Sequence, residues 1–368
     1  MKQSRIVYLI VITVLACIIG SSFGRSVSID RRGLVHAMGI DRTDSGYQVT
    51  LQIFRTGGGG ADTAVDVSKP NVTCAVCEGK TVGEALANAR SATGKELFFG
   101  HLQLICIGGG TPLDDPAELF AFALGDKNIS PAVSLCMAEN TASEVMEQRL
   151  SDKMTSAEAL TSLLDVSCEY SDTLSCDLKE LLGAEGCAAM PVLRVRTPDN
   201  SEESSDSEED STDISESLEL AGTAVIEADR VLDKDEALAA AMLSGKADKG
   251  FAVTDIKGEK VTCELEDIKC VKRLYLAENT LHMKSTVTLV ARADLPLDSD
   301  EALLLGEELS RKLTDSCSRF QKEMLYNNTD IFGITQLIKH RCPQIWLDYG
   351  SEVLDDIGAE CEIKVRVA

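Results

Sequence analysis

The first half of the chain alternates strand-like and helix-like patterns of apolar positions. Residues 34–40 and 47–54 are apolar runs joined by Asp44-Ser45-Gly46, which predicts a β-hairpin. Thr81, with Glu84 three residues later, predicts the capped start of a helix that extends to about Thr93. Further strands are predicted at 71–78, 98–108 and 132–139, and further helices at 116–124, 141–149, 156–166 and 177–182.

The second half carries one short and one long helical pattern among several strand patterns. Residues 220–232 predict a hairpin with Ala228-Asp229 at its tip, and Asp233 predicts the cap of a helix over 235–243. An amphipathic helix is predicted over 299–326, with an apolar face of Leu303, Leu304, Leu309, Leu313 and Phe320. Predicted strands cover 251–254, 260–265, 267–276, 281–292 and 359–368.

These elements do not follow a strict strand–helix–strand repeat. The order favours an α+β fold, built as several lobes of mixed sheets with helices, over one doubly wound sheet. A chain of 368 residues with 44% hydrophobic residues is long enough for two or three domains with cores of their own.

An apolar leader precedes this folded part. Lys2 and Arg5 flank an uncharged run that begins at Ile6 and extends through Gly24, so residues 1–27 are interpreted as a signal peptide or a membrane anchor. The run is about as long as a thin bilayer requires. Within it, the sequence V-L-A-C ends at Cys17 and is similar to a lipobox, which makes Cys17 the candidate site of lipidation. An uncleaved anchor helix that contains an unmodified Cys17 is the alternative.

A serine-rich acidic segment divides the chain. Residues 199–219 hold ten Asp or Glu and no Lys or Arg, a composition that cannot bury apolar surface and repels itself. Residues 199–217 are therefore predicted to be a disordered linker. The remaining boundaries follow from it: an N-terminal α+β domain over 28–198, with one or two lobes, and a C-terminal α+β domain over 218–368.

The overall charge limits the possible partners. Sixty acidic and 36 basic residues give a net charge of −24, which disfavours nucleic acid and opposes anionic lipid headgroups. The 13 cysteines have irregular spacing and are interpreted as small buried hydrophobic residues, not as a disulfide framework.

No set of residues predicts catalysis or metal binding. Cys74 and Cys77 lie three apart on a predicted strand, so they point to opposite faces and do not chelate together. The histidines are scattered, at His36, His101, His282 and His340. Neither a nucleophile–base pair nor a phosphate loop is present in the sequence. The prediction is a non-enzymatic protein without a cofactor, tethered on the outer side of a membrane.

Several segments resemble the Ger(x)C family, the C subunits of spore germinant receptors. The resemblance covers about residues 28–198 and 218–368. Its matching positions are Asp30-Arg31-Arg32, Gly39-Ile40-Asp41, Phe99-Gly100-His101, and Asp330, Phe332, Gly333, Pro343 and Trp346. The chain differs from the family at the two positions where an acylated cysteine and a following tryptophan are expected. These positions hold Ser28 and Ile29. Only Cys17, eleven residues upstream, is left to carry a lipid.

The resemblance implies a role in spore germination. It implies a non-catalytic extracytoplasmic subunit in the inner spore membrane, partnered by two polytopic subunits of the A and B types. Whether the chain itself binds a small molecule stays open. The alternatives are a solute-binding lipoprotein of a transporter and a scaffold protein of the cell envelope. For Asp330, Phe332 and Trp346 the sequence favours helix capping and core packing over contact with a partner.

Overall fold

The computed structural model describes most of the chain after the leader. The described residues are 12–14, 31–54, 72–148, 156–183, 188–196, 218–277, 280–354 and 357–368. Cys17, the Gly-rich stretch at 57–60 and the predicted linker lie outside these ranges. Among the described helices, none is both long enough and apolar enough to cross a membrane.

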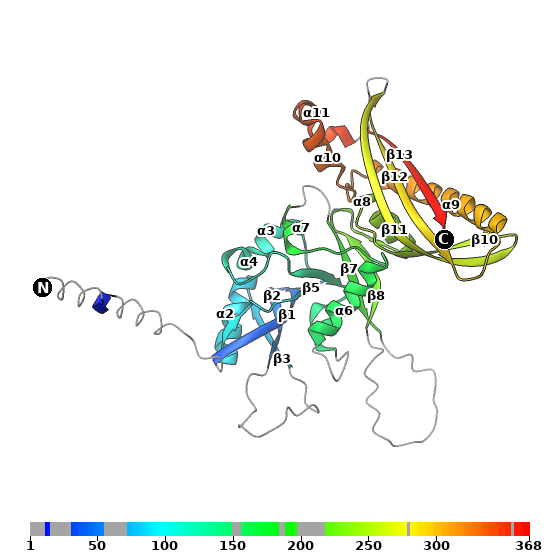
Figure 1. The fold of residues 1–368 in the computed structure, drawn as a ribbon. Helices are drawn as coiled ribbons and strands as arrows, with labels where there is room; N and C mark the ends of the chain where they lie inside the picture. The colour runs from blue at the N-terminus through cyan, green and yellow to red at the C-terminus, as the bar shows by residue number, and fades with distance from the viewer. Residues whose placement is uncertain are drawn as a thin grey trace, which may run out of the picture.

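The first sheet has nine strands in the part of the chain that is described (Figure 1). Its order is β3-β2-β1-β5-β6-β7-β8-β9, with β4 paired to the start of β1. The pairs β1–β5, β5–β6 and β6–β7 are parallel, and the pairs toward both edges are antiparallel. The strands are β1 Arg32–Thr43, β2 Gly46–Phe54, β3 Val72–Gly79, β4 Glu96–Phe98, β5 Leu104–Gly108, β6 Ser134–Ala138, β7 Ala189–Val195, β8 Leu218–Val225 and β9 Arg230–Leu232.

Helices cover both faces of this sheet, because the crossovers between its parallel strands must pass over one face or the other. One core lies under α2, α3, α4 and α7, and a smaller core lies under α5 and α6. The helices are α2 Val82–Thr93, α3 Pro116–Leu119, α4 Ala121–Gly125, α5 Ala142–Glu147, α6 Ser156–Glu169 and α7 Leu178–Gly183. The predicted helix over 116–124 is thus two short helices that meet at Phe120.

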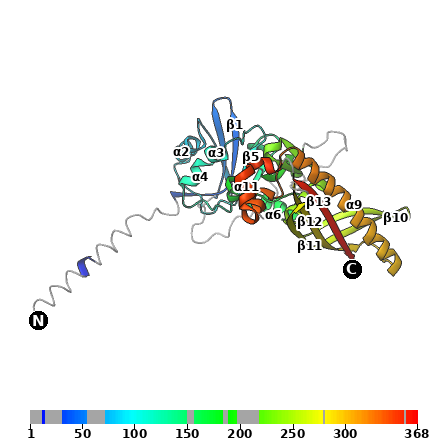
Figure 2. The ribbon, with the colours of Figure 1, turned by 90° about the horizontal axis from the view of Figure 1, so that it is seen from above.

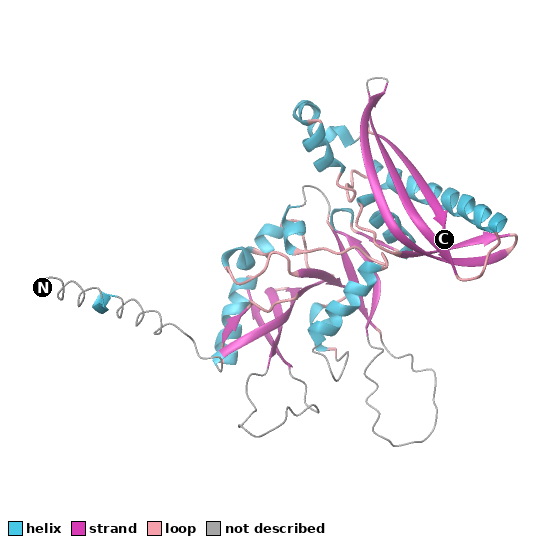
Figure 3. Cartoon of the chain, in the orientation of Figure 1, coloured by secondary structure: helices cyan, strands magenta, loops and turns pink. Residues whose placement is uncertain are grey.

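The second sheet has four described strands in the order β10-β11-β12-β13, of which β12 and β13 are parallel (Figure 3). They are β10 Gly250–Ile256, β11 Glu259–Ala277, β12 Thr280–Ala293 and β13 Gly358–Val367. The long helix α9 Ser299–Tyr326 packs along one face of this sheet. It is followed in the chain by α10 Ile334–Arg341, α11 Pro343–Tyr349 and the 3₁₀ turn η3 Gly350–Leu354. A capping box that was not predicted closes the start of α9, where Asp298 and Glu301 each accept a hydrogen bond from the backbone N–H of the other.

Helix α8, Lys234–Ser244, joins the two sheets. Every residue from Ala237 to Leu243 is buried, so the helix is apolar all round, as expected of a helix in the centre of a core. Its core contains residues of β8 and β9 from the first sheet and of β11 and β12 from the second. In Figures 1 and 2, the second sheet and α9 lie at the opposite end of the molecule from α2 and α4.

The two mixed sheets with helices agree with the predicted multi-lobed arrangement of mixed sheets. The parallel centre of the first sheet was not predicted from the order of elements. Strands β8 and β9 follow the acidic segment in sequence, yet they extend the first sheet beyond β7. The first sheet therefore contains strands from both predicted domains, 28–198 and 218–368. The division of the chain at these boundaries stays a prediction.

Three predicted details are wrong. The strand over 98–108 is two strands: β4 ends at Phe98, and a turn precedes β5, in which the Leu102 N–H donates to the Phe99 carbonyl over 2.9 Å. The strands over 260–265 and 267–276 are one strand, β11, with an irregularity at Asp267, whose φ of 53° is left-handed. Leu303 is 69% exposed, because the buried face of α9 begins at Leu305.

Candidate functional site

The matched Gly39-Ile40-Asp41 segment forms a structural joint, by which we mean a contact that fixes a helix on a sheet. Asp41, at the end of β1, is buried, and its carboxylate accepts hydrogen bonds from the N–H groups of Ala142 (2.6 Å) and Ser143 (2.9 Å) at the start of α5. Burial raises the pKa of Asp41, and the two N–H donors oppose this rise. A side chain at Gly108 would place its Cβ 2.1 Å from a carboxylate oxygen of Asp41, so this position requires glycine.

Gly39 serves the same joint. A Cβ at Gly39 would lie 3.0 Å from Met146 and 3.1 Å from Ala142, so the glycine allows α5 to pack closely on β1. The Gly39-Ile40-Asp41 motif thus fixes α5 on the sheet. Its residues are not arranged to hold a ligand.

The Phe99-Gly100-His101 motif forms the turn between β4 and β5. Phe99 is buried in the core under α2, whereas His101 is exposed. His36 is buried, with its ring centroid 3.9 Å from that of Phe54 and 6.4 Å from that of His101. Burial lowers the pKa of His36, Glu158 raises it, and His101 lowers it slightly further. Within the described residues, the Nδ1 atom of His36 has no hydrogen-bond partner.

The remaining histidines and the Cys74–Cys77 pair form no site with these residues. His282 stacks on Tyr275 in the second sheet, and His340 is exposed on α10. Cys74 donates to the carbonyl of Met146, and Cys77 packs in the core on the opposite face of the sheet, as predicted. Burial raises the pKa of both thiols, which disfavours the reactive thiolate. The described part of the chain brings no three His, Cys, Asp or Glu together in a metal-binding group.

The D-x-F-G segment near the C-terminus is a second structural joint. Asp330 is buried and accepts hydrogen bonds from the N–H groups of Ile334 (2.9 Å) and Thr335 (2.6 Å), which caps α10. Phe332 is 1% exposed and packs edge-on against Phe320. Lys272, on β11, donates to the carbonyl of Phe332. Burial lowers the pKa of Lys272, while Cys270 and Asp330 raise it.

Trp346 is less buried than the sequence suggested. It is partly buried against the C-terminal core, and no residue of α11 is fully buried. The Nζ of Lys339 lies 4.3 Å from the centroid of its indole ring. Phe332 thus confirms the predicted core packing, and Trp346 confirms it in part.

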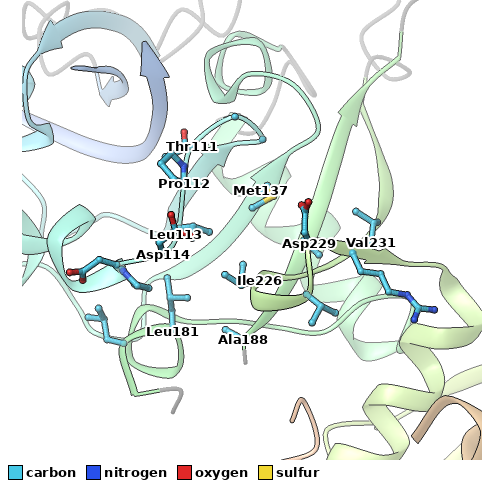
Figure 4. Close-up of a pocket in the computed structure, with 18 of the residues that line it drawn as sticks. Thr111, Pro112, Leu113, Asp114, Met137, Leu181, Ala188, Ile226, Asp229 and Val231 are labelled. Carbon is cyan, nitrogen blue, oxygen red and sulfur yellow. The ribbon is translucent and has the colours of Figure 1, made fainter. Parts of the chain in front are cut away.

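A hollow of about 930 Å³ lies on the face of the first sheet and was not predicted (Figure 4). Residues 109–117 and Asp229–Val231 form opposite walls, with Met137 and Ile226 between them. Arg230 also lines the hollow, but its guanidinium is paired with Glu236 and Glu323. The walls carry Asp114 and Asp229, so the hollow fits an apolar group with a positive charge better than an anion.

A smaller hollow of about 390 Å³ lies where the segments before and after the acidic stretch meet. Lys246 and Asp330 line it from one side, and Lys179 and Glu180 line it from the other. Lys246 pairs with Glu180 over 3.0 Å. Both hollows are lined by residues far apart in sequence, so neither could be predicted from a local sequence motif.

The described residues of neither hollow include a nucleophile held by a base, and the Gly39-Ile40-Asp41 and D-x-F-G motifs serve packing. The protein is thus built from two sheets, and its buried Asp41 and Asp330 hold helices α5 and α10 in place. Comparison with known proteins gives the family. Residues 25–195 match the family described as "Spore germination protein N-terminal domain", and residues 221–368 match "Spore germination B3/ GerAC like, C-terminal". The chain belongs to this GerAC/GerBC family of spore germination proteins, as the resemblance predicted.

Two relatives extend this result. The chain is 24% identical over 360 residues to "Spore germination protein KC" of Bacillus subtilis (strain 168), covering 90% of this chain and 88% of the relative. A solved structure, "Crystal Structure of the GerBC protein", superposes with a TM-score of 0.52 at 13% identity, covering 90% of this chain and 96% of that one. The second likeness shows the fold. The family is not known to contain enzymes.

Proposed function

We propose that the chain is the extracytoplasmic, non-catalytic C subunit of a nutrient germinant receptor in the inner spore membrane. Its partners in this proposal are two polytopic membrane subunits, of the A and B types. The observation that carries the proposal is the pair of family matches, which together cover residues 25–195 and 221–368.

The proposal includes a tether. The apolar run at 6–24 attaches the chain to the membrane, with or without acylation at Cys17. A tether places the folded part at a high effective concentration beside membrane partners, so modest interfaces are sufficient for assembly. Mass spectrometry of the mature N-terminus, extracted from membranes, distinguishes a retained leader from a lipid on Cys17. A soluble protein that begins near Phe23 or Arg25 contradicts both forms of the tether.

Deletion of the gene tests the receptor role. We expect normal spore formation, loss of the germination response to one class of nutrient, and retention of germination by a trigger that bypasses receptors. A copy of the gene restored at a second locus should recover the response. If spores respond to every nutrient after the gene and its paralogues have all been deleted, the receptor proposal is wrong and the envelope-scaffold alternative takes its place.

A further inference from the structure

The basic residues of the first sheet and its helices are arranged differently from those in the rest of the chain. Between residues 31 and 148, none of the described Lys or Arg side chains lies within 4.0 Å of a carboxylate oxygen. These residues are Arg31, Arg32, Arg42, Lys80, Arg90, Lys95 and Lys127. After residue 178, by contrast, ion pairs are frequent, for example Arg194–Glu139 and Lys284–Glu362. Among the described residues these cations thus have no carboxylate partner, and Arg32 and Arg42 lie over the rings of Phe98 and Tyr47.

Two of these cations, Arg32 and Arg90, line one hollow of about 370 Å³, and three more are sequence neighbours of residues that line it. Arg32 and Arg90 line it, Arg31 precedes Arg32, and Lys95 and Lys127 adjoin the lining residues Glu96, Asp126 and Asn128. Arg31, Arg90 and Lys127 are exposed. We call the surface formed by Arg31, Arg32, Arg90, Lys95 and Lys127 the basic patch.

The carboxylates within the basic patch are fewer and partly engaged. Glu96 and Asp126 line the hollow, and an oxygen of Asp126 accepts hydrogen bonds from the backbone N–H (2.9 Å) and the side-chain amide (2.8 Å) of Asn128. Arg32 lies over the ring of Phe98, at 5.4 Å from its centroid. The patch is therefore locally positive on a chain whose net charge is −24.

The position of the patch is set by the leader. Seven residue steps lead from Gly24, the end of the apolar run, to Arg31, so Arg31 lies within about 25 Å of an anchor that ends there. With a lipid on Cys17 the limit for Arg31 is about 50 Å. Figures 1 and 2 place α2 and α4 at the end of the molecule where β1 begins, away from the second sheet. Leu124, on α4, is 65% exposed beside this surface and offers an apolar contact.

We propose that the basic patch docks on the anionic phospholipid headgroups of the membrane that holds the tether. This inference rests on the tether of the proposed function and adds the orientation of the folded part. Charges more than about 8 Å apart are largely screened at physiological salt, so the acidic remainder of the chain does not cancel the attraction at the patch. The same acidic remainder favours the orientation in which it points away from the membrane.

Hydrogen exchange of the full chain with lipid vesicles tests this docking. The vesicles are phosphatidylcholine alone or phosphatidylcholine with about 30% phosphatidylglycerol. We expect exchange in peptides covering 31–34, 94–98 and 121–128 to slow about threefold on the anionic vesicles only, at about 0.05 M salt, and to recover at about 0.5 M. Flotation of the same samples reports attachment separately.

The variant Arg90→Gln/Lys95→Gln/Lys127→Gln should lose the protection. Its matched control, Lys260→Gln/Lys269→Gln/Arg273→Gln, removes three exposed cations from the second sheet and should keep it. The milder variant Arg31→Gln/Lys127→Gln should reduce the protection in part, and it serves if the triple variant folds poorly. Equal exchange on both vesicle types, or protection lost in the control and kept in the patch variant, overturns the proposal.

The flotation result distinguishes the two proposals. A chain held by both vesicle types with unchanged exchange retains its tether and contradicts the docking. A chain that floats only with anionic vesicles, and only with the patch intact, supports the docking and contradicts the tether. A chain held by neither vesicle type contradicts both.

Discussion

Asp41 and Asp330 have the same function at two distant points of the chain. Each is a buried carboxylate that accepts two backbone N–H groups at a helix start, in α5 and in α10. Aspartate in this position satisfies donors that the helix itself leaves unpaired. The sequence predicted the cap at Asp330 from its residue type, but the cap at Asp41 could not be predicted, because its partners follow about a hundred residues later.

Replacing Asp330 with asparagine tests the importance of that carboxylate. Asparagine keeps one acceptor oxygen but loses the second acceptor and the negative charge near Lys272, so we expect Asp330→Asn to lower the free energy of unfolding by about 2 kcal/mol. Urea unfolding of the full chain measures this. The control Asp298→Asn, at the exposed capping box of α9, should cost little because asparagine caps as well as aspartate there. Equal losses in the two variants would contradict the assignment.

His36 predicts a pH dependence of stability. Its folded-state pKa is below the unfolded value of about 6.5, because burial disfavours the imidazolium. The unfolded chain therefore binds the proton more readily, so the His36 contribution is complete above about pH 6.5 and declines as the pH falls below it. His36→Phe, which keeps an aromatic ring beside Phe54, should reduce the loss of stability between about pH 7 and pH 5. His340→Gln, at an exposed position, serves as control, and an unchanged slope in His36→Phe would contradict the assignment.

At the scale of single helices and strands, the sequence predicted the elements that depend on neighbouring residues and missed those that depend on distant ones. The β1–β2 hairpin was predicted because its apolar strands and its Asp44-Ser45 turn are both local. The break between β4 and β5 was missed, because residues 98–108 are mostly apolar and β4 is defined by its pairing with the distant start of β1. Leu303 was assigned to the buried face of α9 from periodicity alone, which cannot show where along a 28-residue helix the sheet begins.

The acidic segment connects two neighbouring strands. Val195 of β7 pairs with Leu218 of β8, so the two ends of residues 196–217 lie side by side in the sheet. Deleting 201–213 still leaves enough chain to close a hairpin, since hairpin loops need only a few residues. We expect the thermal midpoint to change by less than about 2 °C, because the deleted residues are serine and acidic residues that bury no apolar surface. A fall of many degrees in differential scanning calorimetry would show that the segment packs against the fold.

At the scale of the whole molecule, the parts before and after the acidic segment meet along a charged seam. The seam consists of three ion pairs, each between a lysine after the segment and a carboxylate before it. They are Lys234–Asp172 (3.1 Å), Lys246–Glu180 (3.0 Å) and Lys249–Glu169 (2.5 Å). Next to them Tyr170 stacks on Phe251, with ring centroids 5.2 Å apart. Such long-range complementarity has no signature in a single sequence, so the seam and its hollow could not be predicted.

A charge exchange across the seam tests whether it couples the two parts. The Lys246–Glu180 pair is partly exposed, so its net contribution is about 0.2–1 kcal/mol, and reversing one partner replaces attraction with repulsion. Lys246→Glu should therefore lower the free energy of unfolding by about 1–2 kcal/mol, and Glu180→Lys by a similar amount. The double variant should recover much of this loss, because the ion pair is restored in the opposite sense. It should not recover all of it, since Lys246 also donates to the carbonyl of Ser175.

A double-mutant cycle by urea unfolding, at low and high salt, measures the coupling, which should shrink as salt screens the charges. If the two single losses simply add in the double variant, Lys246 and Glu180 are not coupled, and this ion pair does not hold the two parts together.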